Sequence, residues 1–176
     1  MNITIFGGSQ PQPGSPAYVQ AYELGKLLAS AGHTVLTGGY MGTMEAASRG
    51  ANEAGGHVIG VTCADIETWR GSRANPWVKE ERRFASLQER LNELILACDA
   101  AIALPGGPGT LAEITLTWNL MIIDSIPRKP LVLVGDGWKN VLETFQQEFA
   151  IYTYHDQAKF ITFAGTIHEA SELVSR

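Results

Sequence analysis

Short apolar runs alternate along the chain with longer segments whose apolar positions repeat at helical spacing. The short runs predict strands at 3–6, 34–37, 57–61, 100–104, 130–134 and 160–163. The longer segments predict helices at 16–31, 43–54, 80–98, 138–150 and 166–175, with a further helix from the turn at 105–109 to about residue 124. This alternation predicts an α/β fold: a single Rossmann-like, doubly wound and mainly parallel sheet flanked by helices.

Local signals agree with this assignment. Ser15 directly precedes Pro16, which predicts a capped helix start, and Gly32 is a typical helix end. The run at 100–104 is apolar at every position, as expected of a strand that helices cover on both faces. No linker divides the chain, so we expect residues 1–176 to form one domain.

Ligands of doubly wound sheets bind beyond the carboxyl ends of the strands, which directs attention to the loops after the first four predicted strands. The longest irregular segment, 64–79, holds two tryptophans and several basic residues in a chain that is acidic as a whole. A solvated surface loop is the simplest interpretation of this segment. Its position at the ligand edge also makes it a candidate lid.

The composition narrows the class of partner. Of the 176 residues 45% are hydrophobic and 18% are charged, as in an ordinary globular protein, and the net charge of −5 argues against nucleic acid or an acidic membrane as a partner. No secretory signal or membrane-spanning stretch is visible. Cys63 and Cys98 form no CxxC pair, and the four histidines show no metal-ligand spacing. We therefore expect a cytoplasmic protein with reduced cysteines and no zinc site.

Two predicted strand–helix turns share a glycine-rich pattern. "TGGYMGTMEA" at 37–46 and "LPGGPGTLAE" at 104–113 each contain paired glycines, one more glycine and a threonine, and "FGGSQ" at 6–10 follows the first strand. Glycine lets a backbone approach an anion closely, and the helix that follows presents unpaired N–H groups and the positive end of its dipole. The three turns together favour a ligand that carries phosphate. In the loops after the first and second strands the candidate contacts are Gly8, Ser9, Gly38, Gly39, Gly42 and Thr43.

The sequence also narrows the kind of phosphate site. A P-loop needs GxxxxGK[ST], and neither glycine turn has the lysine, which argues against an NTPase. Residues 107–112 match the dinucleotide fingerprint GxGxxA, and Asp136 falls at the end of the next strand. This match is short and lies too late in the chain to leave room for a separate substrate domain. NAD(P) is therefore the weaker alternative.

Two charged residues have both a structural and a chemical interpretation. Thr110 and Glu113 fit the T-x-x-E capping box, in which each side chain bonds the backbone N–H of the other residue. Arg90 could pair with Glu93, three residues along the same predicted helix. In the chemical interpretation, Glu113 is a carboxylate held beside a bound phosphate. The local sequence leaves both interpretations open.

The same stretch resembles a known family. "PGGPGTLAE" at 105–113 matches PGGxGTxxE, the signature of the LOG-like proteins, which are cytokinin-activating phosphoribohydrolases long mislabelled as lysine decarboxylases. "ERLNELILACDAAIALPGG" at 89–107 is similar to the ERKxxM…SDAFIALPGG segment of that family, which aligns Arg90 with the family's active-site arginine. The segments at 37–61 and 128–138 also resemble the family, so the similarity covers most of residues 1–140.

The resemblance implies a homodimeric, nucleotide-binding, Rossmann-like protein that hydrolyses the bond between N9 of the base and C1′ of the ribose in a nucleoside 5′-monophosphate. AMP or a cytokinin-type monophosphate would give the free base and ribose 5-phosphate. The resemblance calls for neither pyridoxal phosphate nor a metal. It implies that Arg90 and Glu113 are the catalytic pair and that the 5′-phosphate is bound by Gly106, Gly107, Gly109 and Thr110.

These residue types suit that reaction. Cleavage of an N-glycosidic bond builds positive charge on the ribose, which a carboxylate beside C1′ stabilises more in the transition state than in the ground state. The carboxylate can also orient or deprotonate the attacking water. An arginine can hold such a carboxylate through a bidentate pair, and the phosphate positions the sugar.

The chain departs from the family at two places. Leu91 stands where the family has a lysine, and 64–86 does not follow the family pattern in the segment expected to contact the base. Relatives of this fold include non-catalytic carriers of the molybdenum cofactor, a pterin with a phosphate tail. Stacking and charge for a pterin could come from Trp69, Trp77, Arg70, Arg73, Arg82 and Arg83. A carrier or sensor of a phosphate-bearing ligand is therefore the alternative function.

Overall fold

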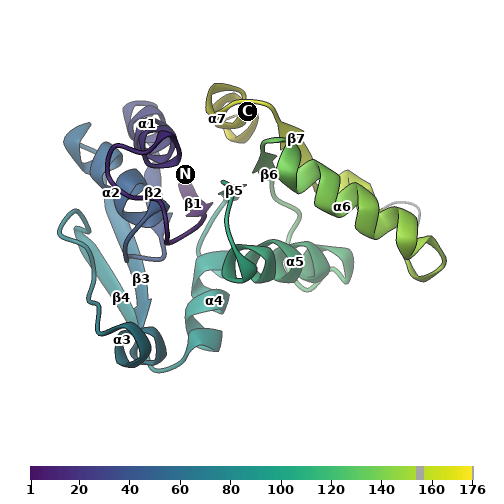
Figure 1. The fold of residues 1–176 in the computed structure, drawn as a ribbon, viewed down its shortest axis with the longest axis horizontal. Helices are drawn as coiled ribbons and strands as arrows, with labels where there is room; N and C mark the ends of the chain where they lie inside the picture. The colour runs from purple at the N-terminus through teal and green to yellow at the C-terminus, as the bar shows by residue number, and fades with distance from the viewer. Residues whose placement is uncertain (154–156, 176) are drawn as a thin grey trace.

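The computed structural model describes residues 1–153 and 157–175, so His155 lies outside the described residues. Seven strands in the described part form one parallel sheet (Figure 1). The strands are β1 (Asn2–Phe6), β2 (Thr34–Thr37), β3 (Val58–Cys63), β4 (Glu80–Phe84), β5 (Ala100–Ala103), β6 (Leu131–Val134) and β7 (Thr162–Ala164). The predicted α/β class and the parallel, doubly wound sheet are confirmed.

The strand order is β4-β3-β2-β1-β5-β6-β7. The chain runs outward from β1 through β2 and β3 to β4, and then returns to the other side of β1 with β5. Ile3 is therefore in register with Val35 of β2 on one side and with Ala100 of β5 on the other. Doubly wound sheets bind their ligands at the carboxyl ends of the strands where the order reverses, which are β1 and β5 here.

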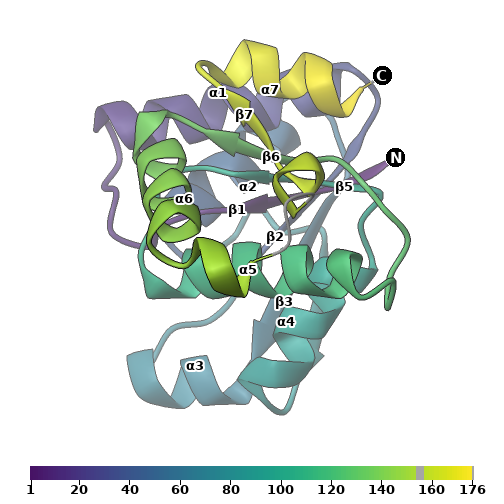
Figure 2. The same cartoon turned by 90° about the vertical axis from the view of Figure 1, so that its right-hand side faces the viewer.

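Helices cover both faces of the sheet (Figures 1 and 2). The helices are α1 (Pro16–Ser30), α2 (Thr43–Glu53), α3 (Ala64–Arg70), α4 (Leu87–Leu96), α5 (Pro108–Ile122), α6 (Asp136–Glu148) and α7 (Ile167–Val174), with short 3-10 turns η1 (Ala150–Tyr152) and η2 (Gln157–Phe160). Apolar side chains of α1, α2 and α7 pack on one face, and those of α4, α5 and α6 pack on the other. Ser15 caps α1 by accepting from the Tyr18 amide, with Pro16 at the first helical position as predicted.

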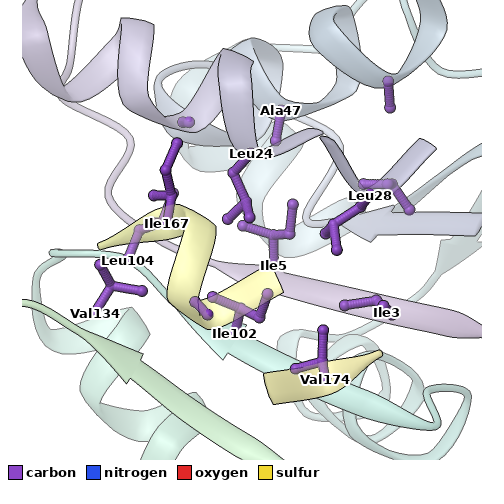
Figure 3. Packing of buried hydrophobic residues seen from close by; sticks show 14 of the residues in the cluster. Ile3, Ile5, Leu24, Leu28, Ala47, Ile102, Leu104, Val134, Ile167 and Val174 are labelled. Carbon is purple, nitrogen blue, oxygen red and sulfur yellow. The ribbon is translucent and has the colours of Figure 1, made fainter. Parts of the chain in front are cut away.

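Two apolar layers hold the central strands in place. Ile3 and Ile5 of β1 belong to the layer beneath α1 and α7, whereas Phe6 belongs to the layer beneath α4 and α5. Figure 3 shows the first layer, in which Leu24 and Leu28 of α1 point toward the strands. This division follows from the two-residue period of a strand. The carboxyl ends of β1 and β5 are thus carried by a well-packed core.

Two segments differ from the sequence prediction. The helix predicted over 80–98 is shorter, because residues 80–84 form β4 and α4 begins only at Leu87. β4 has the sequence EERRF and lies at the edge of the sheet, where charged side chains are common. It lacks the apolar alternation by which a strand is recognised in a sequence. The segment at 64–79, expected to be irregular, contains α3, a seven-residue helix with no buried side chain.

Candidate functional site

A cavity of about 490 Å³ lies between the turn after β1 and the turn after β5. Gly8 and Ser9 border it from the first turn, and Gly107, Gly109 and Thr110 border it from the second. Its other walls come from α3, α4, the start of α2, Tyr40 in the turn after β2, and Ala112 and Glu113 of α5. The volume lies within the range of small-molecule sites. The cavity therefore coincides with the reversal of strand order, where a ligand is expected.

The turn at 104–110, which we call the open turn, leads into α5 with unpaired amides. Gly107 is the N-cap, and Pro108 occupies the first helical position, where its missing N–H removes no helical hydrogen bond. No side chain caps this helix end, and the amides of Gly109 and Thr110 donate to no other described residue. With the positive end of the helix dipole, these amides form a potential anion site beside the cavity.

Gly106 brings the turns after β1 and β5 together. A Cβ at Gly106 would lie 2.2 Å from the hydroxyl oxygen of Thr110 and 3.0 Å from the Gly8 nitrogen. The Gly8 amide donates to the Pro105 carbonyl at 3.3 Å. Gly106 lies outside the cavity lining, so its direct contact with a phosphate stays a prediction.

The turn at 37–43, which we call the closed turn, has the same glycine pattern, but the first amide of its helix, that of Thr43, is bonded to the loop after β1. The amide and the hydroxyl of Thr43 both donate to the Gly8 carbonyl, at 3.0 and 2.9 Å. Gly42 has a φ of 74°, and a Cβ there would lie 2.6 Å from the Gly8 oxygen and from Ser9. The cavity lining includes none of Gly38, Gly39, Gly42 and Thr43. The closed turn thus supports the loop after β1. Contacts of Gly38, Gly39, Gly42 and Thr43 with a phosphate stay a prediction.

Arg90 of α4 is buried under the closed turn. Only 5% of it is exposed, and its guanidinium donates to the Val61 carbonyl at 2.8 Å and to the Gly38 carbonyl at 3.2 Å. A Cβ at Gly38 would lie 1.8 Å from Nη2 of Arg90, so Gly38 makes room for this side chain. The alternative pairing of Arg90 with Glu93 is wrong, because Glu93 accepts from Arg82 at 2.7 Å. Backbone carbonyls therefore fix Arg90 against the cavity.

Glu113 lies three residues after Thr110, on the same side of α5. It is 8% exposed, and its Oε1 is 3.9 Å from Nη1 of Arg90. Burial raises the pKa of Glu113 from its ordinary value of 4.5 to about 7, against the lowering effect of Arg90. The contact with Arg90 is a single long one, looser than the bidentate pair that the residue types suggested.

The capping box that Thr110 and Glu113 could form is absent. Since α5 begins at Pro108 with Gly107 as its cap, Thr110 is already the third helical residue. Within the described part of the chain, the carboxylate of Glu113 contacts Arg90 and accepts no hydrogen bond. A buried, perturbed carboxylate at a cavity is typical of a functional site. The capping interpretation of Glu113 is therefore wrong, and the chemical one stays a prediction.

The segment after β3 forms another wall of the cavity. Ile66, Trp69 and Arg70 of α3 line it, together with Leu87 and Leu91 of α4. The tryptophan and the arginine were candidates from the sequence. The three aliphatic residues were not singled out for binding, because such side chains carry no chemical signal until the fold brings them to a cavity.

The remaining candidates for contact with a pterin lie outside the cavity lining. Trp77 packs against the guanidinium of Arg49, 5.3 Å from its ring centroid. Arg82 pairs with Glu80 and Glu93, Arg83 pairs with Glu67, and Arg73 is exposed. Of the six stacking and basic candidates, the fold thus brings Trp69 and Arg70 to the cavity.

Other expectations concern metals and membranes. Among the described residues, no three His, Cys, Asp or Glu side chains gather so as to hold a metal ion. Within the same ranges no helix has the length and apolar character needed to cross a membrane. Cys63 and Cys98 are both free and buried.

Sequence comparison identifies related proteins. Residues 1–166 match the SLOG cluster4 family. A probable cytokinin riboside 5′-monophosphate phosphoribohydrolase of Oryza sativa subsp. japonica is 34% identical over 147 residues, which cover 81% of this chain and 58% of the relative. A cytokinin riboside 5′-monophosphate phosphoribohydrolase of Arabidopsis thaliana is 34% identical over 147 residues, with coverage of 81% and 66%. The chain therefore spans less than two thirds of the length of these curated relatives.

Solved structures point to a second group of relatives. The molybdenum cofactor binding protein of Rippkaea orientalis has a TM-score of 0.76 and 28% identity, and the match covers 99% of this chain and 94% of the other. The molybdenum cofactor carrier protein of Chlamydomonas reinhardtii has a TM-score of 0.74 and 28% identity, with coverage of 99% and 95%. The fold is thus shared along nearly the whole chain.

Proposed function

Because the chain belongs to the SLOG cluster4 family, we propose that it is a phosphoribohydrolase of nucleoside 5′-monophosphates. Its substrate would be AMP or a cytokinin-type monophosphate, and its products would be the free base and ribose 5-phosphate. The names of the curated relatives support this reaction. One observation carries the proposal: α5 presents unpaired amides at its start and a buried carboxylate one turn later, both at the same cavity.

The open turn would hold the 5′-phosphate. The amides of Gly109 and Thr110 are donors without another partner in the described structure, and the Thr110 side chain borders the same cavity. Ser9 could add a hydroxyl from the loop after β1. Binding energy from the phosphate, which does not react, would position C1′ of the ribose near the carboxylate.

Glu113 would act at the bond between ribose and base. A water oxygen bonds to C1′ while the bond from C1′ to N9 breaks, so the ribose gains a hydroxyl and the base leaves with the bonding electron pair. The carboxylate accepts a proton from the water and afterwards gives it up, and the departing base takes up one proton at its nitrogen, so the reaction balances and Glu113 is ionised again. The negative charge of Glu113 also stabilises the positive charge that develops on the ribose. Arg90 would keep the carboxylate beside that position.

The raised pKa of Glu113 suits such a role. A general base works best when its pKa lies near the working pH, and burial brings the pKa of Glu113 to about 7. The ionised carboxylate is the active form, so turnover should rise with pH through the neutral range.

Base release from AMP tests the proposal directly. The wild-type chain should produce adenine and ribose 5-phosphate, measured by chromatography. Glu113→Gln keeps the shape of the side chain but removes its charge, so turnover should fall about 10³-fold while AMP binding stays within about threefold. The surface variant Glu143→Gln in α6 is the matched control and should keep full turnover. Full turnover in Glu113→Gln would remove Glu113 from the mechanism.

A non-catalytic carrier of a phosphate-bearing pterin is the second candidate. The named molybdenum cofactor proteins support it, since each matches 99% of this chain. If no base is released from a panel of nucleoside monophosphates, and a pterin is found bound to the purified protein by mass spectrometry, this candidate replaces the first.

We also propose that the chain forms a homodimer. The family resemblance implies one, and large apolar side chains are exposed along α4, α5 and the segment after α6, including Leu96 at 59%, Ile123 at 62% and Ile151 at 85%. Light scattering at micromolar concentration should give twice the chain mass, and a monomeric mass would contradict the proposal. A cytoplasmic location and the absence of a nucleic-acid partner stay predictions.

A further inference from the structure

The α3–α4 end of the cavity has an unusual side-chain composition. Trp69 is 75% exposed, although it is the largest apolar side chain of α3, and it borders the cavity beside the aliphatic Ile66, Leu87 and Leu91. An exposed aromatic ring at a cavity wall is a surface on which a planar ligand can stack. The guanidinium of Arg70 lies 4.7 Å from the centroid of the Trp69 ring.

Arg70 differs from Arg82 and Arg83, because it has no acidic partner among the described residues. Arg82 and Arg83 pair with glutamates at 2.7 and 2.8 Å. In contrast, Arg70 lines the cavity and its contact is the Trp69 ring. Its guanidinium donors are therefore available to a ligand.

The acidic side chains of α3 are bonded to other parts of the protein and do not line the cavity. Asp65 accepts from the Leu87 amide at 2.8 Å, and Glu67 accepts from Arg83. The α3–α4 end of the cavity lining consequently holds two polar side chains, Arg70 and Arg90, and both only donate. Arg90 already donates to the Val61 and Gly38 carbonyls, so Arg70 is the one of the two with no hydrogen-bond partner among the described residues. Such an end is complementary to a ring whose edge carries hydrogen-bond acceptors.

We propose that the α3–α4 end of the cavity binds an oxo-substituted heterocycle. The ring would stack on Trp69, and Arg70 would donate hydrogen bonds to the acceptor atoms at the edge of the ring. This inference rests on the proposed function, because it names the base of the substrate. A 6-oxopurine presents O6 and N7 as adjacent acceptors that match the arginine fork, whereas a 6-aminopurine offers N7 and turns an N–H donor toward the cation. AMP can therefore bind, but the 6-oxo ring gains one more hydrogen bond. The oxo-pyrimidine ring of a pterin offers the same kind of edge.

IMP and AMP provide a matched pair of probes, since their rings differ at position 6. We expect IMP to bind the wild-type chain about tenfold more tightly than AMP, measured by calorimetry. Arg70→Leu keeps the apolar stem and should bring IMP down to the affinity of AMP, and Arg70→Lys should do nearly the same because it loses the fork. The neighbouring exposed Arg73→Leu is the control and should change neither affinity.

Trp69→Ala tests the stacking surface separately. Both nucleotides should bind about tenfold more weakly or worse, since stacking of a base on an aromatic side chain contributes about 1–3 kcal/mol, whereas ribose 5-phosphate, which has no base, should bind as before. The control is Trp77→Phe, because the Trp77 ring packs against Arg49 outside the cavity lining. All these measurements are of binding and do not depend on turnover.

If IMP and AMP both bind the wild-type chain and bind equally well, the inference is overturned. It is also overturned if Arg70→Leu weakens ribose 5-phosphate as much as it weakens IMP, because that result would assign Arg70 to the phosphate. The proposed function fails in a different way. If a phosphorylated pterin binds, no nucleotide does, and Arg70→Leu weakens the pterin about tenfold, then the oxo-ring site stands and the phosphoribohydrolase does not.

Discussion

The open turn and the closed turn are nearly alike in sequence and differ in what they contact. Each joins a parallel strand to a helix through glycines followed by threonine. In the closed turn both donors of Thr43 are bonded to Gly8, whereas in the open turn the Thr110 amide has no partner among the described residues. Three residues after the threonine, the helix of the closed turn has the fully buried Ala46, and that of the open turn has Glu113.

The comparison teaches that a glycine pattern indicates a close approach to the backbone but does not indicate whether the neighbour is a ligand or another part of the protein. The loop after β1 lies between the two turns and is bonded to both. The Gly8 carbonyl accepts from Thr43 of the closed turn, and the Gly8 amide donates to Pro105 of the open turn. In the closed turn the first helical residue, Thr43, thus holds the loop that forms a cavity wall. In the open turn the first helical residue is Pro108, which has no N–H, and the unpaired amides that follow belong to Gly109 and Thr110 at the cavity.

The largest effect on stability is expected when a substitution in the closed turn pushes it away from the loop after β1. In Gly42→Ala, a Cβ would lie 2.6 Å from the backbone of Gly8 and Ser9, at a φ of 74° that L-residues disfavour. The two penalties should lower the free energy of unfolding by about 3 kcal/mol or more, measured by denaturant titration.

Gly55→Ala separates the two penalties in Gly42→Ala. Gly55 has a φ of 81°, but a Cβ there would meet nothing within 4 Å, so its replacement should cost only the strain of the backbone, about 1 kcal/mol. Equal losses in the two variants would mean that the closed turn is not closed by the loop after β1.

The second effect is the pH dependence of stability that comes from Glu113, whose place in the helix after the closed turn is taken by Ala46. Below pH 4.5 its carboxyl group is protonated in the folded and the unfolded chain alike and contributes nothing to pH dependence. Between 4.5 and about 7 the unfolded chain releases this proton and the folded chain keeps it, so the free energy of unfolding falls as the pH rises and stays lower above 7. The loss should be on the order of 3 kcal/mol.

Glu113→Gln isolates this contribution, because glutamine does not titrate. The difference in unfolding free energy between wild type and Glu113→Gln should therefore shift in favour of the variant across that window. A difference that is constant from pH 4.5 to 8 would mean that the carboxyl group ionises normally in the folded chain.

The third effect separates stability from binding in the open turn. Gly109 lies in the first turn of α5, and a Cβ there would meet nothing within 4 Å. Gly109→Ala should leave the free energy of unfolding unchanged or raise it by up to about 1 kcal/mol, since alanine favours a helix. The added methyl group would crowd the phosphate, so ribose 5-phosphate should bind about tenfold more weakly, by calorimetry. Unchanged binding would show that the phosphate does not approach Gly109.

Much of the fold could be predicted because the buried parallel strands are apolar at nearly every position. β5 and β6 were visible as continuous apolar runs, and the start of α1 was visible from Ser15 and Pro16. β4 could not be recognised, because a charged edge strand lacks the apolar alternation that marks a strand. α3 was missed because none of its side chains is buried, which leaves no apolar stripe.

The charged residues of the site could be predicted from the sequence, because their chemistry makes them candidates. The roles of the glycine turns and the aliphatic residues could not, because these depend on how the chain packs. Glu113 was a candidate from the local sequence and Arg90 from the family resemblance, and the fold brings them to one cavity. The sequence could not tell the open turn from the closed one, because the difference depends on Gly8, which is far from both turns in the chain. The aliphatic wall at Ile66 and Leu87 likewise forms only when α3 and α4 meet the cavity.

The smallest effect on stability is expected from the two threonines, which match in the sequence pattern although Thr43 is the first residue of α2 and Thr110 the third of α5. Thr43→Val removes the hydroxyl that donates to Gly8 at 2.9 Å, so the free energy of unfolding should fall by about 1 kcal/mol. Thr110→Val removes a hydroxyl that forms no hydrogen bond to a described residue, so unfolding should change by less than about 0.5 kcal/mol. Ribose 5-phosphate should instead bind Thr110→Val about tenfold more weakly and bind Thr43→Val nearly as well as wild type, because a hydrogen bond to a charged phosphate contributes about 1.5–3 kcal/mol. If Thr43→Val loses affinity and Thr110→Val does not, then the phosphate binds at the turn that we have called closed.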